Sequence, residues 1–171
     1  MKSPRTDATA RLAAAVAWSI AAVCTDAAPA AGPKLLEPER AFAFSVQALD
    51  AKTVEARFAI ASGYYLYREK LRFSVEPASL ASAPSLPAGK IKDDEFFGKV
   101  ETYRGELAVK LTLGQPAPGS KLVVRAESQG CADVGVCYPP QIQSVTVTLP
   151  LPGMPPAAPV AATPARKSWF N

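Results

Sequence analysis

Short runs of alternating apolar and polar residues fill the middle of the chain, and they constrain the fold more than any other feature. Alternation with a period of 2 places one face of a strand on a core and the other in water. Turn-forming stretches such as 62–63, 84–89 and 114–119 separate the runs, and no window carries a convincing helical period. The apolar positions of the runs are Phe42, Phe44 and Val46; Val54, Ala56, Phe58 and Ile60; Leu71, Phe73 and Val75; Leu107, Val109, Leu111 and Leu113; and Val145, Val147 and Leu149. This spacing predicts an all-β fold, an immunoglobulin-like antiparallel β-sandwich.

The two ends of the chain differ from this middle part. Within residues 1–30, basic residues precede an uncharged stretch from Leu12 to Val23, and small residues follow up to Ala30. This is the pattern of a secretory signal peptide, and the stretch is shorter than the roughly 20 residues of a transmembrane helix. Residues 150–171 are rich in Pro and Ala without periodicity, which predicts a disordered tail. We therefore expect one globular domain over residues 31–149.

Residue composition narrows the chemistry that this domain can perform. The sequence contains no histidine, which excludes catalysis by imidazole and most zinc sites. The formal net charge of +4 comes from Lys and Arg scattered among acidic residues, so we expect no nucleic-acid binding. Any chemistry must come from cysteine, carboxylate, tyrosine or lysine side chains. We expect neither a metal nor an organic cofactor.

The cysteines are the strongest candidates for a reactive group. Cys24 lies in the predicted signal peptide, and its removal is favoured over lipidation because Val23 stands where lipoprotein signals have a small residue. Cys131 and Cys137 are separated by five residues, and two thiols this close in an exported chain should form a disulfide. A closed loop of about 7 residues stabilises a fold by only about 2.4 kcal/mol. The spacing leaves two interpretations open: a redox-active pair, or a structural disulfide in a non-enzymatic binding or scaffold domain.

Three segments add to the pattern around these cysteines. In 130–140, two glycines permit close backbone approach and a Tyr-Pro-Pro sequence follows the second cysteine. In 63–68, three tyrosines occupy four consecutive positions, so at least one points away from the buried face. In 93–98, two phenylalanines follow three carboxylates, and such an apolar pair is expected to cover something.

Together these segments resemble the N-terminal periplasmic domain of the DsbD thiol:disulfide interchange protein. The matching stretches are GYYLYREKLRF at 63–73, DDEFFGKVETYRG at 93–105 and QGCADVGVCYPP at 129–140, and the likeness covers roughly residues 36–149. The resemblance implies an immunoglobulin-like fold in which Cys131 and Cys137 cycle between dithiol and disulfide. It implies that Cys137 forms the mixed disulfide with a partner.

The resemblance also assigns roles to the surroundings of the pair. Phe96 would be the ring that shields the disulfide and must move before a partner can reach it. The site would be lined by Asp94, Glu95, Tyr65 and Tyr67.

The partners implied are periplasmic thioredoxin-fold proteins, namely disulfide isomerases and a cytochrome c maturation reductase, together with a membrane-embedded electron donor. Members of the family continue into a membrane domain, whereas the sequence here ends at Asn171. We therefore expect either a monomer in the periplasm that meets its donor in trans, or a truncated copy.

Overall fold

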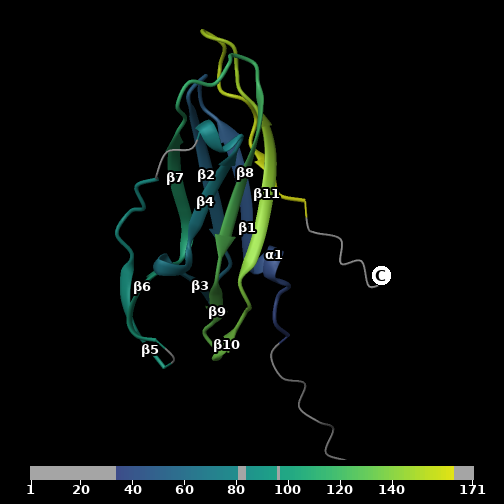
Figure 1. The fold of residues 1–171 in the computed structure, drawn as a ribbon. Helices are drawn as coiled ribbons and strands as arrows, with labels where there is room; N and C mark the ends of the chain where they lie inside the picture. Colours follow the sequence, from purple (N-terminus) through teal and green to yellow (C-terminus); the bar gives the residue numbers. More distant parts are fainter. Residues whose placement is uncertain (1–33, 81–83, 96, 164–171) are drawn as a thin grey trace, which may run out of the picture. The chain divides into compact units, whose positions relative to one another are not determined.

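The computed structural model describes residues 34–80, 84–95 and 97–163, all within one compact unit that begins at Lys34 (Figure 1). The predicted signal peptide and Phe96 lie outside the described residues. Among the residues described, no helix is long and apolar enough to cross a membrane.

In this part of the chain nearly all regular structure is antiparallel β-strand, arranged in three sheets (Figure 1). The four-stranded sheet has the order β12-β1-β2-β7, with β1 (Phe42–Ala48), β2 (Thr53–Ile60), β7 (Gly105–Thr112) and β12 (Val160–Ala161). The three-stranded sheet has the order β11-β8-β4, with β4 (Arg72–Glu76), β8 (Lys121–Ser128) and β11 (Gln141–Thr148). The five-stranded sheet has the order β10-β9-β3-β6-β5, with β3 (Tyr64–Tyr67), β5 (Lys90–Asp94), β6 (Gly98–Tyr103), β9 (Gly130–Ala132) and β10 (Val136–Cys137).

Helical structure in the described residues is limited to single turns, which are α1 (Pro38–Ala41), η1 (Arg68–Lys70) and η2 (Ala78–Leu80). The prediction of an all-β fold is therefore confirmed. The five runs of alternating residues identified in the sequence coincide with β1, β2, β4, β7 and β11, except that Leu71, Leu113 and Leu149 each lie one residue outside the strand.

The main core forms between the four-stranded and the three-stranded sheets. Phe44 of β1 and Phe58 of β2 are cross-strand partners whose ring centroids lie 4.9 Å apart. Phe73 of β4 reaches both rings from the other sheet, at 6.4 Å from each. Burying each such side chain stabilises the fold by about 1.5–3 kcal/mol. The alternating pattern thus positions two sheets face to face, as in a sandwich.

The segment after β11 differs from the sequence expectation between residues 150 and 163. Here β12 pairs with the edge of β1, where the amide of Ala162 donates to the carbonyl of Phe44 at 2.8 Å. The amide of Ala157 donates to the carbonyl of Ala48 at 2.9 Å. An unpaired strand edge offers backbone groups to any extended segment, and such pairing needs no alternating side chains. Composition predicted a disordered tail here, whereas part of this segment adds a strand to the four-stranded sheet.

The run of tyrosines in β3 is buried on both of its faces. Tyr64 belongs to the main core, whereas Tyr65 and Tyr67 pack with Val100 and Cys131 in a second, smaller cluster. The five-stranded sheet therefore has one face on the core and another that encloses the cysteine pair. Strand β3 is the element that joins the two.

Candidate functional site

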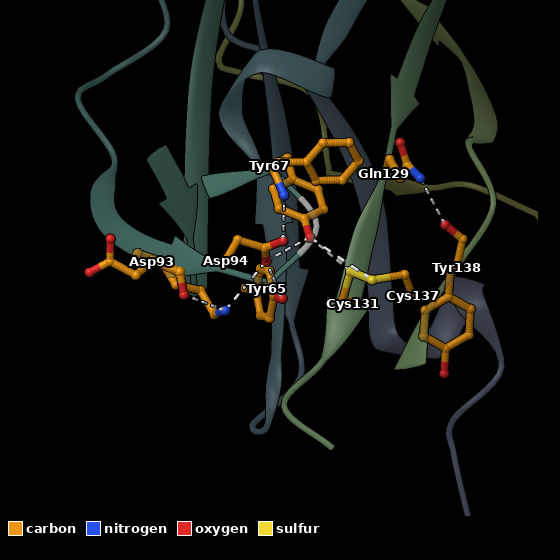
Figure 2. Close-up of a disulfide and its surroundings, with 10 residues drawn as sticks. Tyr65, Tyr67, Asp93, Asp94, Gln129, Cys131, Cys137 and Tyr138 are labelled. Atoms are coloured by element: carbon orange, nitrogen blue, oxygen red, sulfur yellow. Dashed lines mark hydrogen bonds and ion pairs between the residues drawn. A yellow bond between two sulfur atoms is a disulfide. The ribbon is translucent and has the colours of Figure 1, made fainter. Parts of the chain in front are cut away.

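The two cysteines sit opposite each other on the hairpin formed by β9 and β10. They are cross-strand partners with Cα atoms 3.9 Å apart, and a disulfide joins their sulfur atoms (Figure 2). The pairing expected from the sequence is present in the structure.

Two glycines allow the hairpin to form where it does. Gly135 in the turn has a φ of 85°, in the left-handed region that glycine adopts without strain. Gly130 begins β9 and has no room for a side chain, because a Cβ atom there would collide with the backbone oxygen of Tyr65 and would lie 2.7 Å from the ring of Phe42. Close packing of β9 against β3 therefore requires glycine at position 130.

The two sulfur-bearing residues differ in their exposure. Cys131 is completely buried, whereas Cys137 is partly exposed on β10, an edge strand of the sheet. The amide of Tyr138 donates to the carbonyl of Gly130 at 2.9 Å, which makes the cysteines a non-hydrogen-bonded pair of the hairpin. The backbone N–H and C=O of Cys137 consequently point away from β9, toward the open edge. A reactant can approach Cys137 and not Cys131.

A hydrogen-bonded group of side chains lies on the inner side of the disulfide. The hydroxyls of Tyr65 and Tyr67 each donate to Oδ2 of Asp94 at 2.9 Å. The Tyr67 hydroxyl also lies 3.1 Å from the sulfur of Cys131 and 3.9 Å from that of Cys137, and Figure 2 shows it between the carboxylate and the sulfurs. A disulfide sulfur carries no hydrogen, and the single proton of the Tyr67 hydroxyl is donated to Asp94, so the hydroxyl oxygen contacts the sulfurs without a second full hydrogen bond.

Protonation states in this group follow from burial. Burial, together with the neighbouring Tyr65 and Asp94, raises the pKa of Tyr67 far above its ordinary value, so its hydroxyl keeps its proton and acts as a donor. Burial alone would lower the pKa of Lys92, but its hydrogen bonds to Asp94 and Tyr65 leave that pKa above the ordinary value. Lys92 reaches Oδ2 of Asp94 at 3.3 Å and therefore stays charged beside it.

A second charged pair lies on the hairpin turn. Arg104 makes a two-pronged ion pair with Asp133, with nitrogen to oxygen distances of 2.6 and 3.0 Å. The guanidinium carbon of Arg104 and the ammonium group of Lys92 lie 5.0 and 4.9 Å from the centre of the Tyr65 ring. Cations held over an aromatic face in this way restrain the ring.

The predicted lining residues lie around the pair as follows. A cavity of about 110 Å³ borders Cys137, and its walls include Tyr65, Asp94 and the exposed Glu95. Tyr67 lies deeper, against Cys131. Phe96 is outside the described residues, so its shielding role stays a prediction. The neighbouring Phe97 packs edge-to-face on Tyr67, with ring centroids 5.3 Å apart, and is 48% exposed.

Sequence reasoning did not identify Lys92, Arg104 and Asp133 as part of the site. The signal that could have found Asp133 is its place between the two cysteines. Lys92 and Arg104 are ordinary surface cations by sequence, and only the pairing of β5, β6 and β3 brings them together. In the part of the chain that the structure describes, no cluster of three or more histidine, cysteine or acidic residues could hold a metal ion.

Comparisons with known proteins agree on one family. The profile of the family described as thiol:disulfide interchange protein DsbD, N-terminal, matches residues 32–149. DsbD of Ralstonia nicotianae is 46% identical over 147 residues, which cover 84% of this chain and 24% of that protein. DsbD of Escherichia coli K12 is 40% identical over 110 residues, 64% of this chain and 19% of that protein. The chain thus spans about a quarter or less of these curated relatives.

Two solved structures are similar in fold. The reduced DsbD N-terminal domain of Neisseria meningitidis has a TM-score of 0.64 and 34% identity, over 75% of this chain and 96% of that one. The same domain in a complex with the PilB N-terminal domain has a TM-score of 0.57 and 35% identity, over 69% of this chain and 94% of that one.

Fold and site together define an immunoglobulin-like β-sandwich domain with a disulfide, both of which the sequence predicted, and the structure places that disulfide across two strands at a sheet edge. The chain belongs to the DsbD N-terminal domain family of thiol:disulfide interchange proteins.

Proposed function

We propose that this chain is a periplasmic thiol-disulfide exchange domain. It relays reducing equivalents from a membrane-embedded donor, in trans, to periplasmic thioredoxin-fold proteins such as disulfide isomerases and a cytochrome c maturation reductase. The observation that carries the proposal is the asymmetry of the disulfide, with Cys137 partly exposed at an edge and Cys131 buried beside it. Exchange needs one sulfur that a partner can reach and a second that resolves the intermediate.

The chemistry runs through two exchanges. In the reduced domain, the Cys137 thiolate attacks one sulfur of a partner's disulfide, and the partner's other sulfur leaves as a thiolate and takes up a proton. The Cys131 thiol then loses its proton and attacks the Cys137 sulfur, which releases the partner's remaining thiolate. The domain's two thiols become a disulfide, and the partner's disulfide becomes two thiols. The membrane-embedded donor reduces the Cys131–Cys137 disulfide again by the same two steps in reverse.

The open edge of β10 supports docking of a partner. Because the backbone groups of Cys137 point outward, an extended partner segment can pair with them, as in other cases of strand addition. Val134 and Val136 on the same hairpin are 58% and 42% exposed and offer apolar contact beside the sulfur. This geometry suits a partner whose own reactive cysteine lies next to an extended loop.

Direct exchange with a purified thioredoxin-fold protein tests the function. Reduced chain is mixed with an oxidised disulfide isomerase, and transfer is followed by thiol alkylation and mass measurement. We expect full transfer with the parent, a trapped mixed disulfide through Cys137 with Cys131→Ala, and no reaction with Cys137→Ala. Trapping through Cys131 in the Cys137→Ala variant, or no transfer with the parent, would contradict the assignment.

The reduction potential separates this function from the alternative of a scaffold domain with a structural disulfide. Structural disulfides of exported proteins typically lie below about −300 mV, whereas those that exchange lie higher. Equilibration of the chain with glutathione buffers measures this value. A potential below that limit would favour the scaffold alternative.

Export to the periplasm is a further part of the proposal, supported by the pattern in residues 1–30. We expect cleavage near Ala30, which leaves a monomer without Cys24. Mass spectrometry of the exported protein checks the cleavage, and light scattering checks the oligomeric state. A product that retains Cys24 with attached lipid would contradict the expectation.

A further inference from the structure

The turn between the two cysteines is held against the start of β3 by the side chain of Arg104 and by a backbone hydrogen bond. Arg104 is the residue between β6 and β7, and its two terminal nitrogens hold both carboxylate oxygens of Asp133. The same Arg104 donates to the carbonyl of Tyr64 at 3.3 Å, and the amide of Asp133 donates to the carbonyl of Gly63 at 2.8 Å. The turn is therefore tied to the start of β3 through its backbone and through its side chain.

These contacts of the turn have the largest effect on the position of the cysteines when the disulfide is open. Two register pairs, Ala132 with Val136 and Cys131 with Cys137, make up the ladder between β9 and β10. Strand β10 lies at the sheet edge and has β9 as its neighbour. So short a hairpin is marginal without other contacts. Once the covalent bond is gone, Cys137 is held on one side by the bond from the amide of Tyr138 to the carbonyl of Gly130, and on the other side by whatever holds the turn.

We propose that Arg104 is a positioning residue for the cysteine pair, which acts by holding Asp133 so that Cys131 stays beside Cys137 when the disulfide is open. The inference rests on the proposed function and names the group that keeps the two thiols together. In the resolving step, the Cys131 sulfur attacks the Cys137 sulfur and releases the partner. It must do so before another thiol attacks the mixed disulfide. A held turn keeps the effective concentration of Cys131 high, and a released turn lowers it.

The expected effect is modest and falls on the cysteines rather than on the fold. The side chains of Arg104 and Asp133 are 41% and 46% exposed, so water screens the pair and the oxidised fold depends little on it. A pair of this kind changes an equilibrium constant by up to about fivefold. We expect Arg104→Gln to lower the equilibrium constant for forming the disulfide from glutathione disulfide by about two- to fivefold, equivalent to about 9–21 mV.

Three variants and one control test the proposal. The variants are Arg104→Gln, Asp133→Asn and the double substitution, and the control is Arg125→Gln. Arg125 forms an ion pair of similar exposure with Glu76, at 3.0 Å, between β8 and β4 of the three-stranded sheet. Each variant is equilibrated with glutathione, and its thermal unfolding is measured in the oxidised state. The lifetime of the mixed disulfide with a thioredoxin-fold partner is measured as well.

Positioning and a direct charge effect predict opposite patterns. Without a positioning role, loss of the Arg104 cation would disfavour a thiolate and loss of the Asp133 anion would favour it, so the two single variants would differ in sign. With positioning, both lower the disulfide equilibrium constant, both lengthen the mixed-disulfide lifetime, and the double variant equals Arg104→Gln, because Asp133 acts through Arg104. Arg125→Gln leaves both readouts at the parent values, while its effect on thermal unfolding matches that of Asp133→Asn, which likewise removes one exposed ion pair.

Several results would overturn the inference. These are opposite signs for the two single variants, additive effects in the double variant, or parent-like equilibrium constants in both. Because the glutathione equilibrium needs no protein partner, it tests Arg104 even if the parent fails to exchange with thioredoxin-fold proteins. That failure would count against the proposed function and not against the positioning role.

Discussion

Removal of one hydroxyl, in Tyr67→Phe, tests how the interior of the site supports the disulfide. Tyr67 is 2% exposed, and its hydroxyl donates to Asp94 while it contacts the sulfur of Cys131. Asp94 keeps the hydroxyl of Tyr65 and the amide of Phe97 as donors, so the substitution does not leave the carboxylate without hydrogen bonds. We expect a loss of about 1.5–3 kcal/mol in the free energy of unfolding, the value of one hydrogen bond to a charged group.

Tyr65→Phe is the matched control for this substitution. Its hydroxyl donates to the same oxygen of Asp94 at the same 2.9 Å as that of Tyr67. Denaturant unfolding should therefore show similar losses in the two variants. The contact with the sulfur of Cys131 belongs to Tyr67, so the chemistry of the disulfide should separate them.

Reduction by dithiothreitol is the assay that distinguishes the two variants. When a thiolate attacks Cys137, the sulfur of Cys131 leaves as a thiolate, and leaving is faster when that thiolate is stabilised. The Tyr67 hydroxyl is in place to donate to it, so Tyr67→Phe should slow reduction by about tenfold, equivalent to about 1.4 kcal/mol. Tyr65→Phe should reduce at close to the parent rate. Equal slowing in the two variants, or a parent-like rate in Tyr67→Phe, would refute the reasoning.

Three further substitutions or conditions have defined outcomes. Gly130→Ala should destabilise the oxidised domain by about 1–3 kcal/mol or more, because the added Cβ collides with backbone, and an unchanged denaturation midpoint would contradict this. Because its bond to Arg104 lowers the pKa of Asp133 below 3.8, the contribution of that pair to stability is present above pH 3.8 and is lost as the pH falls through the folded value. The difference in unfolding free energy between the parent and Asp133→Asn, at most about 1 kcal/mol, should thus vanish in strong acid, and a difference that persists there would argue against the pair. Finally, Phe96→Ala should speed reduction by dithiothreitol with a modest fall in thermal stability, and identical reduction rates would show that Phe96 does not shield the pair.

The strands that the sequence predicts are those with one buried and one exposed face. In β1, β2, β4, β7 and β11 the apolar and polar residues alternate because the two faces of the strand differ in exposure. Strand β3 has no alternating pattern, because its four residues are all buried. In β8 the alternation of Leu122, Val124 and Ala126 is obscured by Val123, which is partly buried on the other face. The mostly polar β5 and β6 were not predicted either, since pairing with neighbours, rather than an apolar face, defines them.

Residue types by themselves limited the chemistry of the site to that of the two cysteines. Without histidine, and with two nearby cysteines in a predicted exported chain, thiol-disulfide exchange or a structural disulfide were the alternatives, and the family resemblance added the surrounding residues. Only tertiary structure decided which sulfur a partner can reach. That depends on β10 lying at a sheet edge while Tyr65 and Tyr67 bury Cys131. The sequence carries no local sign of this, because exposure and the partners of a surface cation such as Arg104 depend on strands that are distant in the chain.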